Sequence, residues 1–160
     1  MSITLRRFAL QQLPALAALV IAALASQPAG AQVQQGAEAS AYKIVINAAN
    51  PVSSLTREEA SRLFLKKVTM WKDAKPVAIV DQKASSPVRE RFTKDVHGRQ
   101  VASVTSYWQQ MIFSGRAVPP IEKTSDADVA AFVAANAAAI GYVASNADLP
   151  SGVKVVALTK

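Results

Sequence analysis

Short apolar segments rich in β-branched residues alternate with helical segments along this chain. Segments of this kind are typical of strands buried on both faces, and we expect strands at residues 42–47, 76–80, 139–143 and 153–158. Strands that alternate with helices form a sheet with mainly parallel strands and helices on both faces. The sequence therefore predicts an α/β domain with a mainly parallel sheet flanked by helices.

Capping residues mark where the predicted helices begin. Thr56 and Glu59 form a capping box for a first helix, which we expect to end near Lys66 or Lys67. The other helices are expected to begin after Ser86, to span 101–113 and to begin after Ser125. The expected inward-facing residues of the third helix are Val104, Trp108, Met111 and Ile112. Large aromatic side chains usually belong to the core, which we expect for Trp71, Trp108 and Tyr142.

Residues 1–31 have the pattern of a secretory signal peptide. Arg6 and Arg7 precede an apolar run from Leu13 to Leu24, and small residues at 29–31 complete a cleavage site. The alternative is a membrane anchor, but the apolar run is shorter than the ~20 residues that cross a bilayer. We therefore expect a periplasmic protein that has no stable membrane anchor after cleavage.

Cleavage would leave residues 32–160, with a flexible leader at 32–41 and a single domain at 42–160. The chain has no cysteine, so its core must hold the fold without disulfides. Removing Arg6 and Arg7 from the 18 basic residues leaves 16 against 11 acidic ones, a net charge of +5. This charge indicates a soluble basic surface or an acidic partner, and we expect no nucleic-acid partner because basic residues and stacking aromatics form no stripe.

The sequence lacks the residue patterns that metal binding and nucleophilic catalysis require. No pattern of His, Cys and carboxylates has the spacing of a metal site, and no nucleophile lies in a recognisable catalytic motif. His97 stands near a predicted helix end, where we expect it to be solvated and to interact with the helix dipole. We therefore expect no metal, no cofactor and no enzymatic activity.

One candidate ligand site lies where the second strand leads into the second helix. Ligands of open α/β sheets bind at the carboxyl ends of strands, and a helix start attracts anions through its free N–H groups. Here Ser85 and Ser86 supply hydroxyl groups and Arg89 supplies a cation. Asn47 and Gln82 are candidate secondary donors. The sequence thus indicates a small-anion site made of these five residues.

The same residues also have a purely structural interpretation. Ser86 would then be an ordinary helix cap, and Arg89 would point into water or pair with a carboxylate. Asn47 would only shape the turn that follows the first strand. The sequence alone leaves both interpretations open.

Several motifs together resemble the small, stand-alone relatives of the phosphate-binding proteins of ABC transporters. The resemblance extends from Tyr42 to Leu158 and rests on residues 55–71, 89–92, 107–108, 112–115 and 139–143. It implies a type II periplasmic binding-protein-like fold, of which this chain corresponds mainly to one lobe. It also implies a binding module that takes phosphate or a similar oxyanion.

Of the residues that form the family's phosphate site, only Ser86 has a match in this sequence. Aligning the aromatic residue of the second helix places Gln82 at the family's Arg and Ser86 at its Ser, while Pro87 and Val88 replace Gly and Thr. Pro87 removes an N–H donor and Val88 a hydroxyl, so we expect weak binding in which Arg89 compensates. The alternative is a ligand-free interaction or adaptor module with an envelope-protein or transporter partner.

Overall fold

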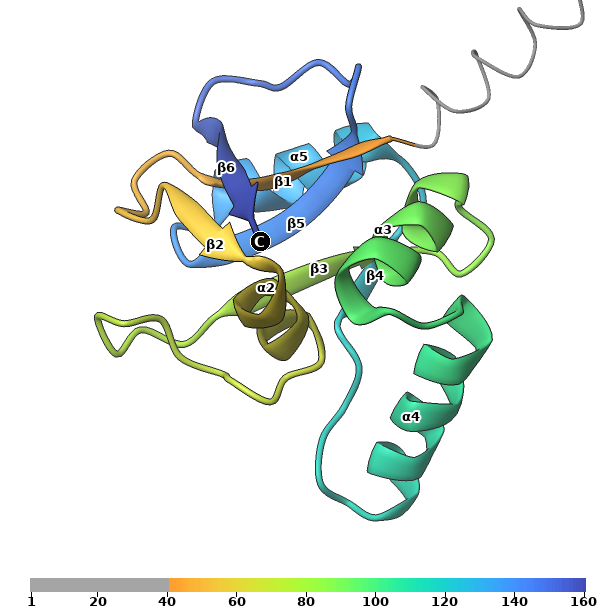
Figure 1. Cartoon of the computed structure of the whole chain (residues 1–160). Coiled ribbons are helices and arrows are strands. Elements are labelled where there is room, and N and C mark those ends of the chain that lie inside the picture. The colour runs from red at the N-terminus through yellow and green to blue at the C-terminus, as the bar shows by residue number, and fades with distance from the viewer. Residues whose placement is uncertain (1–40) are drawn as a thin grey trace, which may run out of the picture.

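The computed structural model describes residues 41–160. The expected signal peptide (1–31) and all of the expected leader except Ala41 lie outside the described residues, so both stay predictions. Figure 1 shows one sheet with helices against both of its faces. Among the described residues, no helix is long and apolar enough to cross a membrane.

Six strands and four helices follow one another along the described chain. The strands are β1 (Tyr42–Asn47), β2 (Ser54–Thr56), β3 (Ala78–Gln82), β4 (Ile121–Lys123), β5 (Ala139–Ala144) and β6 (Val153–Thr159). The helices are α2 (Arg57–Phe64), α3 (Pro87–His97), α4 (Val101–Phe113) and α5 (Asp126–Ala135). The strands lie in the order β2-β6-β1-β5-β3-β4. The predicted α/β class, with helices flanking the sheet, is confirmed.

The sheet is mixed, because the central strand β1 runs antiparallel to both of its neighbours, β5 and β6. The other three pairings, β2 with β6, β3 with β4 and β3 with β5, are parallel. An apolar run shows that a strand is buried but not in which direction it crosses the sheet. The direction of β1 therefore had no counterpart in the sequence pattern.

Alternate residues of the central strands face two separate apolar layers. Ile44 and Ile46 of β1 pack with α2 and α3, whereas Val45 between them packs with α5 on the opposite face. This arrangement is the period-two alternation of a strand that is covered on both faces. Tyr142 of β5 is fully buried on the α2/α3 side, and Trp71 is also buried there, as predicted.

Gly141 allows α5 to lie close against the sheet. A Cβ atom at this position would stand 2.7 Å from Cγ1 of Val80 and 2.8 Å from Cγ1 of Val129. Such distances are too short for carbon atoms, so a side chain here would push α5 away from β3 and β5. The glycine therefore sets the spacing between this helix and the sheet.

Some predicted boundaries differ from the structure. The helix α2 ends at Phe64 instead of Lys66 or Lys67, because the backbone of Lys66 turns left-handed with φ 51°. Strand β3 begins at Ala78, two residues later than predicted, because Pro76 pairs with Met70 in an isolated bridge. The strands β2 and β4 were not predicted, since three residues carry too little pattern to identify a strand.

The helix α4 extends away from the sheet (Figure 1) and is covered on one side only. Val104 and Trp108 are buried together with Leu65, as predicted. Ile112 was predicted to face inward, which is wrong, because its side chain is 51 % exposed. The last turn of α4 reaches beyond the elements that would cover it.

Candidate functional site

The site that the sequence indicated is built around the first turn of α3. Ser86 caps this helix, and its hydroxyl oxygen accepts the N–H of Arg89 at 3.4 Å. Pro87 occupies the first helical position, where a missing N–H does no harm. The side chain of Arg89 turns inward and is only 4 % exposed. A cation buried to this extent needs charged partners within the protein.

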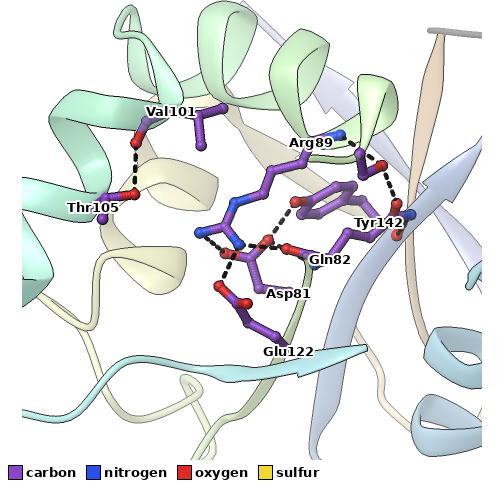
Figure 2. Close-up of polar contacts among 8 residues, drawn as sticks. Asp81, Gln82, Arg89, Val101, Thr105, Glu122 and Tyr142 are labelled. Atoms are coloured by element: carbon purple, nitrogen blue, oxygen red, sulfur yellow. Dashed lines mark hydrogen bonds and ion pairs between the residues drawn. The ribbon is translucent and has the colours of Figure 1, made fainter. Parts of the chain in front are cut away.

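Two carboxylates provide these partners, as Figure 2 shows. Nη2 of Arg89 lies 3.2 Å from Oδ2 of Asp81, the fourth residue of β3. Nη1 of Arg89 donates to Oε1 of Glu122 on β4 and to the carbonyl oxygen of Gln82. The side chain of Asp81 is 12 % exposed and that of Glu122 is 49 % exposed. The guanidinium is therefore enclosed on one side and reaches a half-exposed carboxylate on the other.

Asp81 is held as an acceptor from three directions. Its Oδ1 accepts the hydroxyl hydrogen of Tyr142 and, at 2.8 Å, the N–H of Gln82, while its Oδ2 faces Arg89. Burial raises the pKa of the Asp81 carboxyl, and Arg89, Tyr142 and Gln82 act in the opposite direction. Three donors directed at one carboxyl group fit its ionised form.

The pKa values of the two partners of Asp81 also shift. Burial disfavours the charged guanidinium, but Asp81 and Glu122 outweigh it and raise the pKa of Arg89, which therefore stays charged. Burial and the neighbouring Asp81 raise the pKa of the Tyr142 hydroxyl well above its usual value. Tyr142 is consequently neutral and able to donate.

Gln82 and Ser86 are also engaged within the protein. The hydroxyl of Ser86 donates to Oε1 of Gln82 at 2.5 Å, and Nε2 of Gln82 donates to Oδ1 of Asp126 at 2.6 Å. The same Nε2 reaches the carbonyl oxygen of Tyr142 at 3.2 Å. Gln82 thus connects α3, α5 and β5. We call Asp81, Gln82, Ser86, Arg89, Glu122, Asp126 and Tyr142 the Arg89 network.

Two of the five predicted site residues lie outside this network. Nδ2 of Asn47 donates to the carbonyl oxygens of Val133 and Ala134, both at 2.9 Å, at the carboxyl end of α5. Oδ1 of Asn47 accepts the N–H of Ala49, so the side chain shapes its own turn. Ser85 is exposed just before the cap. The structure thus brings together Gln82, Ser86 and Arg89. It also shows the contacts of the structural interpretation, because Ser86 caps the helix, Arg89 pairs with carboxylates and Asn47 shapes its turn.

The acidic members of the network were not predicted from the sequence. Asp81 follows directly on the buried Val80 within one apolar strand, and a buried acid requires a counter-charge. That position could have indicated a pairing with Arg89. Glu122 had no comparable pattern, because it belongs to one of the short strands that the sequence did not reveal.

His97 is half-buried and bonded within the protein, which corrects the expectation of a solvated residue. Its Nδ1 lies 2.8 Å from the hydroxyl oxygen of Ser61 on α2, and its ring meets the ring of Phe92 edge-on. Burial, assisted by Arg99, lowers the pKa of His97 to about 4. The imidazole is therefore neutral near pH 7 and joins α3 to α2 instead of interacting with the helix dipole. Within residues 41–160, no group of three or more His, Cys, Asp or Glu could hold a metal ion.

Comparison with known proteins identifies the class of protein that this fold defines. The sequence model of the PBP superfamily domain, the periplasmic binding-protein type, matches residues 12–159. The chain therefore belongs to this family. A search of curated proteins found no match.

Solved structures with the same fold include two phosphate-related proteins. An ABC-type phosphate transport receptor from Vibrio cholerae is 24 % identical, with a TM-score of 0.58, over 74 % of this chain and 46 % of that one. A protein from Clostridium perfringens, described as a putative phosphate ABC transporter substrate-binding protein and solved with bound phosphate, is 21 % identical. Its TM-score is 0.59, over 74 % of this chain and 44 % of that one. This chain spans less than half the length of both structures.

The Arg89 network predicts strong coupling between Arg89 and Asp81. In Arg89→Met, the buried carboxylate of Asp81 loses its counter-charge, and the free energy of unfolding should fall by about 3–5 kcal/mol. Adding Asp81→Asn should recover at least about 2 kcal/mol of that loss, because the unpaired charge is removed. Urea denaturation of the single and double variants measures both quantities.

Arg91→Met is the matched control, because Arg91 lies two residues away and forms an exposed ion pair with Asp95. It should cost less than about 1 kcal/mol. If the single Arg89 variant does not fold, a folded double variant would itself report the recovery. Purely additive losses in the double variant would contradict the coupling.

Proposed function

We propose that this chain is a single-lobe solute-binding-like module of the periplasm that binds phosphate or a similar small oxyanion weakly. The ligand would approach Arg89 beside the capped start of α3 and exchange with the carboxylate of Glu122. The main observation behind this proposal is that Glu122, which is distant in the sequence, forms an ion pair with the guanidinium of Arg89. An anionic group of the protein thus occupies the position that a ligand oxyanion would take.

Glu122 is suited to such an exchange. Its side chain is about half exposed and comes from β4, the three-residue strand at one edge of the sheet. If Glu122 turned into water, Asp81 would still neutralise Arg89, so the guanidinium would not be left without a counter-charge. Asp81, in contrast, is buried and held by three donors. The bound phosphate in the Clostridium perfringens structure of the same fold supports the choice of ligand.

The surroundings of Arg89 account for weak binding. Asp81 would still neutralise the guanidinium after Glu122 leaves. At the helix start Pro87 has no N–H, and the N–H groups of Arg89 and Glu90 are bonded to Ser86. An arriving anion would therefore find few donors besides the guanidinium. We expect dissociation constants in the millimolar range for phosphate and sulfate.

Glu122→Gln tests this proposal, because it removes the competing charge and leaves the size of the side chain unchanged. Phosphate affinity should rise about tenfold, and sulfate affinity should rise with it. Isothermal titration calorimetry at pH 7 measures both, with a neutral sugar as the negative control. As a control, Glu90→Gln removes an exposed carboxylate from α3, the helix of Arg89, and should leave the affinity unchanged.

The Asp81→Asn/Arg89→Met double variant should bind neither anion, because it lacks the cation. Two results would contradict the proposal. One is the absence of phosphate binding by Glu122→Gln at about 10 mM. The other is a double variant that binds phosphate as tightly as the unaltered protein does.

A second candidate function is an adaptor for another envelope protein. The observation that favours it is a set of exposed apolar side chains at the end of α4, in the connection that follows it and at the start of β4. The exposed fractions are 51 % for Ile112, 90 % for Phe113, 67 % for Val118 and 56 % for Ile121. Ile112 and Phe113 are adjacent at the end of α4, and adjacent exposed apolar side chains often mark interaction sites.

In-cell photocrosslinking separates this candidate from a plain solvated surface. A photoreactive residue in place of Phe113 should give one discrete adduct with an envelope protein. The same residue in place of the exposed Ser151, in the connection between β5 and β6, is the control and should give none. No adduct at position 113, or the same adducts at both positions, would count against the adaptor.

A further inference from the structure

A hollow lies away from the Arg89 network, among the β1–β2 connection, α2 and the segment that follows α2. Its volume is about 700 Å³, which is within the range of small-molecule sites in proteins. None of its lining residues belongs to the Arg89 network. The proposed function leaves this hollow without a role.

The floor of the hollow is apolar and belongs to the core. Leu55, Leu63 and Trp71 are buried members of the main apolar cluster, and Val52 and Val68 pack against it. Nε1 of Trp71 donates to the carbonyl oxygen of Ala138 at 2.9 Å. The polar atom of the indole is thus already bonded, so the ring offers the hollow an apolar surface. Such a floor suits an aryl or alkyl group.

Backbone and side-chain hydrogen bonds hold the walls of the hollow in place. On one side, the N–H of Ala157 donates to the carbonyl oxygen of Ser53, and Lys154 donates to that of Asn50. On the other side, the N–H of Trp71 donates to the carbonyl oxygen of Lys75 at 2.9 Å. The hollow is therefore formed before any ligand arrives.

Charges at the rim differ in whether they are already paired. The carboxylate of Glu59 caps α2 through the N–H of Thr56 at 2.9 Å, and Asp73 pairs with Lys75 at 2.8 Å. Arg62 is exposed at the rim and forms no ion pair with any of residues 41–160. The rim thus has an available guanidinium, while both of its carboxylates have partners.

We propose that this hollow binds a small amphipathic anion, whose apolar body lies on Trp71 and Leu55 and whose carboxylate or sulfonate meets Arg62. An arginine can hold such an oxyanion through two parallel hydrogen bonds. Met70, which lines the hollow and is 50 % exposed, covers the apolar body from the solvent side. A flexible thioether side chain adapts to ligands of different shape.

Two-dimensional ¹H–¹⁵N NMR of the protein with 3-phenylpropionate as the probe tests this site. The indole N–H of Trp71 should shift and reach saturation, whereas that of Trp108, a buried residue of α4, should stay in place as an internal control. The neutral isostere 3-phenylpropionamide should bind about tenfold more weakly, because it lacks the charge that faces Arg62. Inorganic phosphate should leave the Trp71 resonance unchanged, so failure at this hollow is distinct from failure at Arg89.

Three variants test which residues contact the charged group of the ligand and which contact its apolar body. Arg62→Gln should weaken binding of the carboxylate about tenfold and leave the amide unaffected. Lys67 is an exposed cation just after α2 that does not line the hollow, so Lys67→Gln should leave the affinity for both probes unchanged. Met70→Ser should weaken both probes to the same extent.

Three results would overturn the proposal. The first is no saturable Trp71 shift at about 10 mM probe. The second is equal binding of carboxylate and amide, which would indicate a pocket for an apolar side chain of a partner protein. The third is an Arg62→Gln variant that keeps the preference for the carboxylate.

Discussion

The guanidinium of Arg89 lies almost fully inside the protein, and the elements around it are arranged to keep it charged. Asp81 reaches it from β3 and Glu122 from β4, while Tyr142 of β5 and the backbone of Gln82 hold Asp81 in position. Burying an unpaired charge would cost several kcal/mol, so these strands and the start of α3 must come together for the cation to be tolerated. The same pairing determines what the site can bind, because an incoming anion competes with a carboxylate that is already present.

Much of the fold could be predicted because its pattern is local. The cap at Ser86 with Pro87, and the capping box of Thr56 and Glu59, correctly placed the starts of α3 and α2. The bounds of β1 and α4 matched as well. The direction of β1 was not predictable, since it depends on its long-range pairing with β5 and β6, which local patterns do not encode.

The candidate site was only partly predictable for a related reason. Gln82, Ser86 and Arg89 are close in sequence, and a strand followed by a helix start is enough to bring them together. Glu122 reaches them through a strand pairing that no local pattern announced. Asn47 was expected nearby because it stands at the end of the first predicted strand. In the structure, β1 runs antiparallel to β5 and directs that end toward the carboxyl end of α5. The long-range strand arrangement therefore decided which candidates meet.

The most direct test of the buried pairing is guanidinium-selective ¹⁵N NMR of Arg89 at pH 7. The hydrogen bonds of Nη1 and the ion pair of Nη2 with Asp81 should stop rotation of the guanidinium and shield its protons from water. We therefore predict separate, slowly exchanging Nη resonances for Arg89, beside averaged resonances for the exposed Arg91. A single averaged Nη resonance for Arg89 that exchanges rapidly with water would show that the guanidinium is free, and would contradict its pairing with Asp81 and Glu122.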